Sequence, residues 1–234
     1  MHPRYAGFAA HRPGDVRAPV DTGPVLLDLM LPLECGGCGA PATRWCATCA
    51  AELRARAAQP HVATPRLDPG VPVLVLGRYA GARRNAIVAV KERGRADLVG
   101  PLGQTLRVGL DRLLGWGLLD VPLTVVPAPT RRLAARRRGG DPVTRVARAA
   151  TADLPGVTVT GALRLTGFPR DSVGLSSADR QRNLAGRVRV TRPVHGPVIV
   201  IDDVVTTGAT ACESVRALQT AGAAVQAVVA LAAA

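Results

Sequence analysis

The sequence predicts an α/β protein in which a parallel sheet is flanked by helices and preceded by a small four-cysteine module. Strand-like and helix-like segments alternate beyond residue 70, which is the pattern of βαβ units. The run Val198–Ile201 is continuously apolar, as expected of a strand buried on both faces of a parallel sheet. Four of the 5 cysteines lie between Cys35 and Cys49. These three observations define the fold class.

The predicted elements divide the chain into three parts. Residues 1–24 are a predicted disordered leader, because Pro, Gly and isolated charges occur there without periodicity. Residues 25–58 form the four-cysteine module, which ends in a helix over Ala50–Ala58, and residues 70–234 form the main domain. Strands are expected in this domain at Val71–Tyr79, Leu123–Val126, Val157–Leu163, Val198–Ile201 and Ala224–Leu231. Helices are expected at Asn85–Lys91, Leu98–Leu114, Pro142–Asp153 and Ala209–Ala221.

The charge balance favours a phosphate-rich partner. Lys+Arg number 30 and Asp+Glu 17, so the net charge is 30 − 17 = +13, which suits nucleic acid or a phosphorylated small molecule. All cations except Lys91 are arginines, so a general arginine bias competes with that interpretation. Two Trp, two Tyr and two Phe are too few for a base-stacking surface. No apolar run has the length of a signal peptide or a membrane span, and we expect a cytoplasmic protein without membrane insertion.

The cysteines have the spacing C-x2-C-x7-C-x2-C. Each Cys-x-x-Cys places two sulfur atoms on one tight turn, and two such turns complete a tetrahedral all-sulfur zinc site of the zinc-ribbon type. The ligands would be Cys35, Cys38, Cys46 and Cys49. A redox-active pair and disulfides are the alternatives, although disulfides are disfavoured in a reducing compartment. A zinc ion here would have a structural role and no part in a reaction.

An acidic pair followed by a Thr/Gly loop is the most specific motif of the chain. Asp202 and Asp203 come directly after the buried strand, and a helix begins at Ala209. Ligands of open α/β sheets bind beyond the carboxyl ends of strands, and a helix N-terminus favours an anion. The loop residues that would bind a phosphate are Thr206, Thr207, Gly208, Ala209 and Thr210. The alternative is an ordinary strand end with an Asp that caps the helix.

This motif resembles the phosphoribosyl-diphosphate (PRPP) motif of type I phosphoribosyltransferases. The resemblance implies that Asp202 and Asp203 contact the ribose hydroxyls and their Mg²⁺, and that Thr206–Thr210 bind the 5′-phosphate. It implies a type I phosphoribosyltransferase-like sheet over residues 70–234. Two acidic residues in that family act on the ribose, so we treat Asp202 and Asp203 as the candidate catalytic residues.

The four-cysteine module ahead of such a domain resembles the ComF family of competence-associated proteins. The further matches are Tyr79, Lys91 to Gly94, Pro127 to Pro129, Arg136 to Gly139 and Arg180 to Asn183. The resemblance covers about residues 25–234 and implies that Lys91 and Arg93 contact the diphosphate. Gly140-Asp141-Pro142 departs from the family pattern, as does Ser172, and both departures fall near the expected acceptor side.

The arginine run Arg131–Arg138 has two functional interpretations. Arg136, Arg137 and Arg138 would close over a diphosphate as a flap, or they would contact DNA phosphates without reading bases. A solvated charged surface is the third interpretation.

Two functions follow from these motifs. The first is a PRPP-dependent phosphoribosyltransferase (a glycosyltransferase) with an unspecified acceptor, in which a nitrogen nucleophile displaces magnesium diphosphate from C1 of the ribose. The second, implied by the ComF resemblance, is a DNA-uptake accessory that binds single-stranded DNA and competence proteins without turnover.

Overall fold

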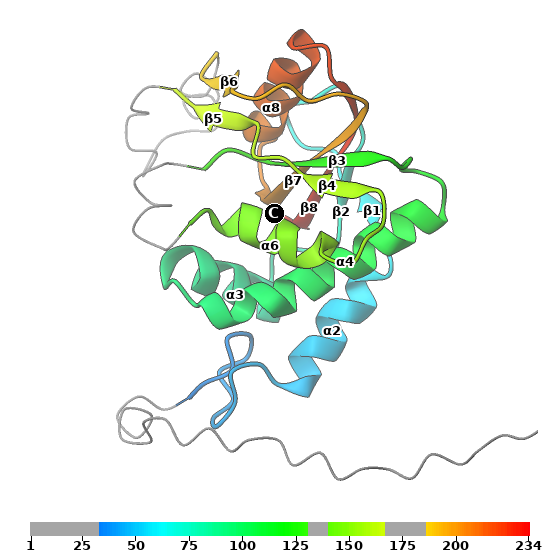
Figure 1. Cartoon of the computed structure of the whole chain (residues 1–234). Helices are drawn as coiled ribbons and strands as arrows, with labels where there is room; N and C mark the ends of the chain where they lie inside the picture. The colour runs from blue at the N-terminus through cyan, green and yellow to red at the C-terminus, as the bar shows by residue number, and fades with distance from the viewer. Residues whose placement is uncertain (1–32, 131–139, 167–185) are drawn as a thin grey trace, which may run out of the picture. The chain divides into compact units, whose positions relative to one another are not determined.

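The structure is a computed structural model that describes residues 33–130, 140–166 and 186–234 (Figure 1). Its helices are α2 (Ala47–Ala57), α3 (Gly81–Glu92), α4 (Val99–Gly115), α6 (Pro142–Thr151) and α8 (Ala209–Thr220), with a 3-10 turn at Ala96–Leu98. Its strands are β1 (His61–Val62), β2 (Val73–Val75), β3 (Leu123–Pro127), β4 (Val157–Val159), β5 (Leu163–Leu165), β6 (Val188–Val190), β7 (Pro197–Val205) and β8 (Ala224–Ala233). The predicted leader 1–24 and the arginine run 131–138 lie outside the described residues.

Six strands form one sheet in the order β1-β2-β8-β7-β3-β4. Neighbouring strands are parallel except for β1 and β2, which pair antiparallel. Strands β5 and β6 form a separate antiparallel pair. The predicted fold class is therefore confirmed: a mostly parallel sheet is flanked by helices (Figure 1), and a compact four-cysteine cluster lies near the start of the described residues.

Strand β7 lies inside the sheet, and its sequence explains why. Ile199 and Ile201 pack in a cluster with residues of α2, α3, α4 and α6, whereas Val198 and Val200 pack in a second cluster with residues of α8. Successive side chains of a strand point to opposite faces. A strand between two helical layers must therefore be apolar at every position, as this run is. Figure 1 shows α3, α4 and α6 on one side of the sheet and α8 on the other.

Helix α6 begins at a well-formed N-cap. The Asp141 carboxylate accepts the Thr144 N–H at 3.2 Å, and Pro142 occupies the first turn, where no backbone donor is needed. The Thr130 hydroxyl donates to Asp141 Oδ1 at 2.9 Å. Asp141 therefore connects the start of α6 to Thr130, which lies shortly after β3. The roles of Asp141 and Pro142 at the start of α6 give a structural explanation for the departure of Gly140-Asp141-Pro142 from the family pattern.

The four-cysteine segment packs on the core of the sheet. The described residues from 33 onward form one compact unit. Cys35, Cys49 and Leu53 are buried in the same cluster as Leu102 and Ile201. The division into a module at 25–58 and a domain at 70–234 stays a prediction of boundaries, but the two segments share one hydrophobic core.

Several predicted elements differ from the structure. The expected strand over Val157–Leu163 is two strands in different sheets, because the Ala162 N–H donates back to Thr160 O at 2.8 Å and turns the chain. The expected strand over Val71–Tyr79 forms only at β2, and β1 and β6 were not expected. Helix α3 begins at Gly81 rather than Asn85, because burial of Ala82 and Arg83 extends it.

Strand β7 is also longer than expected. It continues to Val205, so Asp202 and Asp203 lie within the strand and not in the loop after it. The position matters for the site, because side chains within a strand alternate between its two faces.

None of the helices in the described part of the chain combines the length and apolarity needed to cross a bilayer.

Candidate functional site

From the carboxyl ends of β3 and β7, the chain continues to strands that lie toward opposite edges of the sheet. After β3 it passes through α6 to β4, and after β7 it passes through α8 to β8, which lies at the other side of β7. The two strands are adjacent and parallel, with Pro127 opposite Ile201. Such a reversal of strand order leaves a crevice at the carboxyl ends, where open α/β sheets bind ligands. The topology therefore points to the segments after Pro127 and Ile201.

A pocket lies at the turn from β7 into α8. We call it the loop pocket; its lining residues are Asp202, Val204, Val205, Thr206, Thr207, Gly208, Ala209, Thr210 and Ala211. All five loop residues named from the sequence are among them. The first N–H groups of α8 have no partner within the helix, so this end attracts an anion. Thr206 is exposed and Thr207 and Thr210 are partly buried, which leaves hydroxyl donors beside those N–H groups.

Gly208 is required by the protein's own packing. Its φ of +86° is in the left-handed region. A Cβ there would lie 2.5 Å from Leu67 O and 2.9 Å from Pro65 Cβ. We call residues 63–70 the strap, and its Pro65 and Leu67 therefore pack directly on the loop. The Leu67 N–H donates to Thr207 O at 3.0 Å and links the strap to the loop. The sequence suggested only that Gly208 allows a ligand to approach, and the strap contact was missed.

The acidic pair is buried and joined to Lys91. The Lys91 Nζ lies 2.6 Å from Asp203 Oδ2, which brings the end of α3 to β7. Asp202 and Asp203 are 9% and 8% exposed. The Asp203 N–H donates to Asp202 Oδ1 and the Val204 N–H donates to Asp203 Oδ1, each at 2.8 Å. The structure therefore brings Lys91 to two predicted site residues that lie more than a hundred positions further along the chain.

Burial and charge shift the proton affinities of this cluster. Burial raises the pKa of Asp202 above its usual value, and the adjacent Asp203 carboxylate raises it further. Burial lowers the pKa of Lys91, but the Asp203 carboxylate overcomes that effect, and the pKa is raised overall. The ammonium group is therefore the stable form of Lys91, while Asp202 resists ionisation.

The other predicted cations are placed differently. Arg93 is exposed at the C-cap of α3, and no contact between it and the acidic pair occurs in the described residues. Arg136, Arg137 and Arg138 lie outside the described residues.

Arg83 is a buried charge that the sequence did not reveal. It is 3% exposed, and its Nη1 donates to Leu231 O of β8 at 3.0 Å. Burial lowers its pKa to about 10, although the nearby Glu52 carboxylate opposes the shift. Arg83, Ile87 and Lys91 follow at intervals of four and share one face of α3. Arg83 therefore holds the first turn of α3 to the sheet and Lys91 its last turn. In an arginine-rich chain no local pattern could distinguish Arg83.

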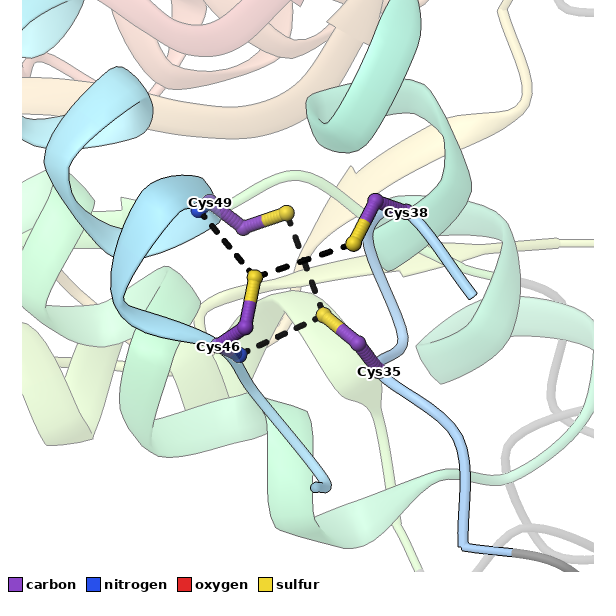
Figure 2. Close-up of side chains that lie close together, drawn as sticks. All are labelled: Cys35, Cys38, Cys46 and Cys49. Atoms are coloured by element: carbon purple, nitrogen blue, oxygen red, sulfur yellow. Dashed lines mark hydrogen bonds between the residues drawn. The ribbon is translucent and has the colours of Figure 1, made fainter. Parts of the chain in front are cut away.

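The four cysteines form a compact cluster (Figure 2). Their sulfur atoms all lie within 4.8 Å of one another. Cys35 Sγ is 3.8 Å from Cys49 Sγ, and Cys38 Sγ is 3.7 Å from Cys46 Sγ. Tetrahedral zinc with bonds of about 2.3 Å separates its sulfur ligands by roughly 3.8 Å. The cysteines are free thiols, and these spacings exceed a disulfide bond of about 2.05 Å. The cluster is therefore suited to a zinc ion.

The local fold aims the thiols at one point. Cys46 caps α2, with its Sγ accepting the Cys49 N–H at 3.5 Å, and the Cys46 N–H donates to Cys35 Sγ at 3.3 Å. A Cβ on Gly37 would lie 2.7 Å from Cys49 Sγ, so the first turn needs a glycine there. Backbone donors of this kind stabilise thiolates, which are the form that binds metal.

The thiols do not ionise independently. Burial raises the pKa of Cys35, but N–H groups of Cys38, Cys46 and Gly37 lower it to about 6. Burial and the neighbouring sulfur atoms raise the pKa of Cys49 above the usual thiol range. Cys35 therefore ionises readily, and its negative charge contributes to the raised pKa of Cys49. A divalent cation removes that repulsion, which is the chemistry expected of a metal-binding cluster.

The four-cysteine turn is attached to α3. Asn85 Nδ2 donates to Gly37 O at 2.7 Å. Arg95 donates to Glu34 O and Arg44 O, each at 3.3 Å. The four-cysteine segment therefore contacts α3 through Asn85 and the residues just after α3 through Arg95, while the acidic pair contacts Lys91 in the last turn of α3.

No family model and no curated protein matches the chain. Among solved structures, UMP synthase of Leishmania donovani is similar, with a TM-score of 0.37 and 14% sequence identity. The similarity covers 80% of this chain and 31% of that chain, so this chain spans less than a third of the length of UMP synthase. The fold assignment rests on the strand order and registers given above.

Proposed function

We propose that the loop pocket binds the ribose 5-phosphate part of PRPP or of a related ribose phosphate. The observation that carries this proposal is the position of the pocket: a helix N-terminus and a buried carboxylate border one crevice at the reversal of strand order. N–H groups and hydroxyls of Thr206–Thr210 would hold the phosphate. Asp202 would accept hydrogen bonds from the ribose hydroxyls.

A transfer reaction at this site would use charge and position more than covalent chemistry. The bond from C1 of the ribose to diphosphate would break as a nitrogen nucleophile forms a new bond to C1, and the nitrogen would release its proton. Positive charge gathers on the sugar while negative charge leaves with diphosphate. Mg²⁺ would neutralise the departing diphosphate. The role of the chain is to hold the ribose and its 5-phosphate while this happens.

The four cysteines would hold a structural zinc ion in this proposal. Its contribution would be to order residues 33–49 and, through Asn85 and Arg95, to hold α3 against the sheet. No step of the transfer would involve it.

The competence hypothesis has less support. DNA binding by Arg136, Arg137 and Arg138 concerns residues outside the described part of the chain, and no described contact favours it. Membership of the ComF family and a cytoplasmic location stay predictions from the sequence. We therefore propose ribose phosphate binding alone.

Calorimetric titration of PRPP with Mg²⁺ tests the proposal. We expect Asp202→Asn to weaken binding by about 10-fold, because the amide replaces one acceptor oxygen with an NH2 group that cannot accept a hydrogen bond from a ribose hydroxyl. Asp153→Asn is the matched control, since Asp153 is an exposed carboxylate just after α6 and is not among the residues that line the loop pocket. Equal affinity of the wild type and Asp202→Asn would refute the assignment.

A further inference from the structure

The two carboxylates of the acidic pair have different surroundings. Asp202 lines the loop pocket and also reaches the edge of a second pocket, whereas Asp203 is not among the described residues that line the loop pocket. Asp203 borders this second pocket, on the side of α3, α4 and α6, which we call the apolar pocket. Alternation along β7 accounts for the difference, because Asp203 follows Ile201 on one face and Asp202 follows Val200 on the other.

The surroundings of Asp203 are mostly hydrocarbon. Besides Lys91, Asp202 and Asp203, the apolar pocket is lined by Ile87, Val90, Leu102, Pro142, Val143, Val146, Ile201 and Leu231. Mg²⁺ needs about six oxygen ligands in near-octahedral geometry, most of them carboxylates, phosphates or water. Among the described residues, the side chains that line this pocket around Asp203 supply no oxygen ligand beyond the acidic pair itself.

Both oxygens of Asp203 are already engaged. Oδ1 accepts the Val204 N–H at 2.8 Å, and Oδ2 lies 2.6 Å from Lys91 Nζ. A metal ion at Asp203 would have to displace the ammonium group and bring its own water into an apolar space. Lys91 is the chain's one lysine among 30 cations, and its compact ammonium fits beside a single oxygen better than a planar guanidinium does.

We propose that Lys91 takes the place of a metal ion at the acidic pair, so that the pocket binds a ribose monophosphate through Asp202 without Mg²⁺. This inference rests on the proposed function and refines it: the two carboxylates do not act alike on the ribose. Asp203 is a positioning residue that holds Lys91, and Asp202 is the one that touches the ligand. Mg²⁺ enters only as the partner of a diphosphate group.

The test compares ribose 5-phosphate binding in EDTA and in Mg²⁺ by calorimetry. We expect the wild-type dissociation constants in the two buffers to agree within about twofold. A requirement for Mg²⁺ would overturn the inference and leave the proposed function standing. If neither ribose 5-phosphate nor PRPP binds in either buffer, the proposed function fails and the inference fails with it.

Variants separate the two carboxylates. The double variant Lys91→Met/Asp203→Asn removes both charges together, so it avoids an unpaired buried ion and should remain folded. We expect its affinity for ribose 5-phosphate in EDTA to fall less than that of Asp202→Asn, which should lose at least tenfold, because Asp203 and Lys91 affect the ligand only through the site around Asp202. Arg84→Met is the control for loss of a positive charge, because it removes an exposed cation from the same helix. Equal losses in the double variant and in Asp202→Asn would overturn the inference.

Discussion

The four-cysteine cluster and the loop pocket differ in how they are assembled. All four ligands of the cluster come from a segment of fifteen residues, and two tight turns and the cap of α2 bring them together. The loop pocket and its acidic pair draw on β7, α8, the last turn of α3 and the strap. A site made of one short segment is specified by spacing, whereas a site made of several segments depends on the fold. The two regions should therefore respond differently to substitution.

The largest expected effect is loss of the cluster. Structural zinc supplies about 10–16 kcal/mol of apparent binding free energy in small zinc-dependent folds. We expect Cys49→Ser to lose its zinc and to lower the melting temperature strongly, because Cys49, 2% exposed, is also part of the main core. Metal analysis and thermal unfolding by circular dichroism measure both effects. Cys212→Ser removes a thiol elsewhere and should keep one zinc per chain. A stable Cys49→Ser protein with full zinc content would contradict the cluster.

A smaller effect is expected at the strap contact. Gly208→Ala adds a Cβ at a position 2.5 Å from Leu67 O and at φ +86°, so it combines backbone strain with a clash. Left-handed strain costs about 1–2 kcal/mol and overpacking about 1–3 kcal/mol. Gly222→Ala isolates the first effect, since its φ is +83° and nothing lies within 4 Å of the added Cβ. We expect denaturant unfolding to show a larger loss at Gly208, together with weaker phosphate binding. Equal losses would mean that the strap does not shape the loop.

The smallest effect distinguishes the two carboxylates. Asp202→Asn should raise the free energy of unfolding at neutral pH by about 1 kcal/mol, because a buried, unpaired carboxylate is costly to ionise. Asp203→Asn should lower it by about 1–3 kcal/mol, because Lys91 loses its partner. Denaturant unfolding of both variants and the wild type provides the comparison. Two changes of the same sign would refute the different roles.

The pH dependence of Asp202→Asn follows from its raised pKa. Below the usual carboxyl value of 3.8, Asp202 is protonated in the folded and the unfolded chain, so its ionisation costs nothing. As the pH rises toward the folded pKa, only the unfolded chain ionises, and the wild type loses stability relative to the variant. The advantage of Asp202→Asn should therefore grow with pH and then level off.

Much of the fold could be predicted from the sequence, because its decisive features are local. The apolar run Val198–Ile201 and the four-cysteine spacing each have few alternative structures. The division of Val157–Leu163 between two sheets could not be predicted, since it depends on one turn at Thr160–Ala162 and on pairing with a distant strand.

The candidate site could be predicted only in part, because some of its contacts join segments that are distant in the sequence. The order of Asp202, Asp203 and the Thr/Gly loop predicted which residues gather. The Lys91 contact came from a resemblance that implied a diphosphate role, and the structure places its ammonium on Asp203. The strap contact at Leu67 is a backbone hydrogen bond, which no side-chain pattern encodes. Whether a carboxylate within β7 faces α3 or α8 depends on register, which the sequence alone did not fix.

A crystal structure of the protein with ribose 5-phosphate, grown in EDTA, tests the central claim most directly. We expect the phosphate at the N–H groups of Gly208–Thr210, the ribose hydroxyls on Asp202, and Lys91 still paired with Asp203. A sugar phosphate bound elsewhere, or a ribose held by Asp203 with Lys91 displaced, would contradict it.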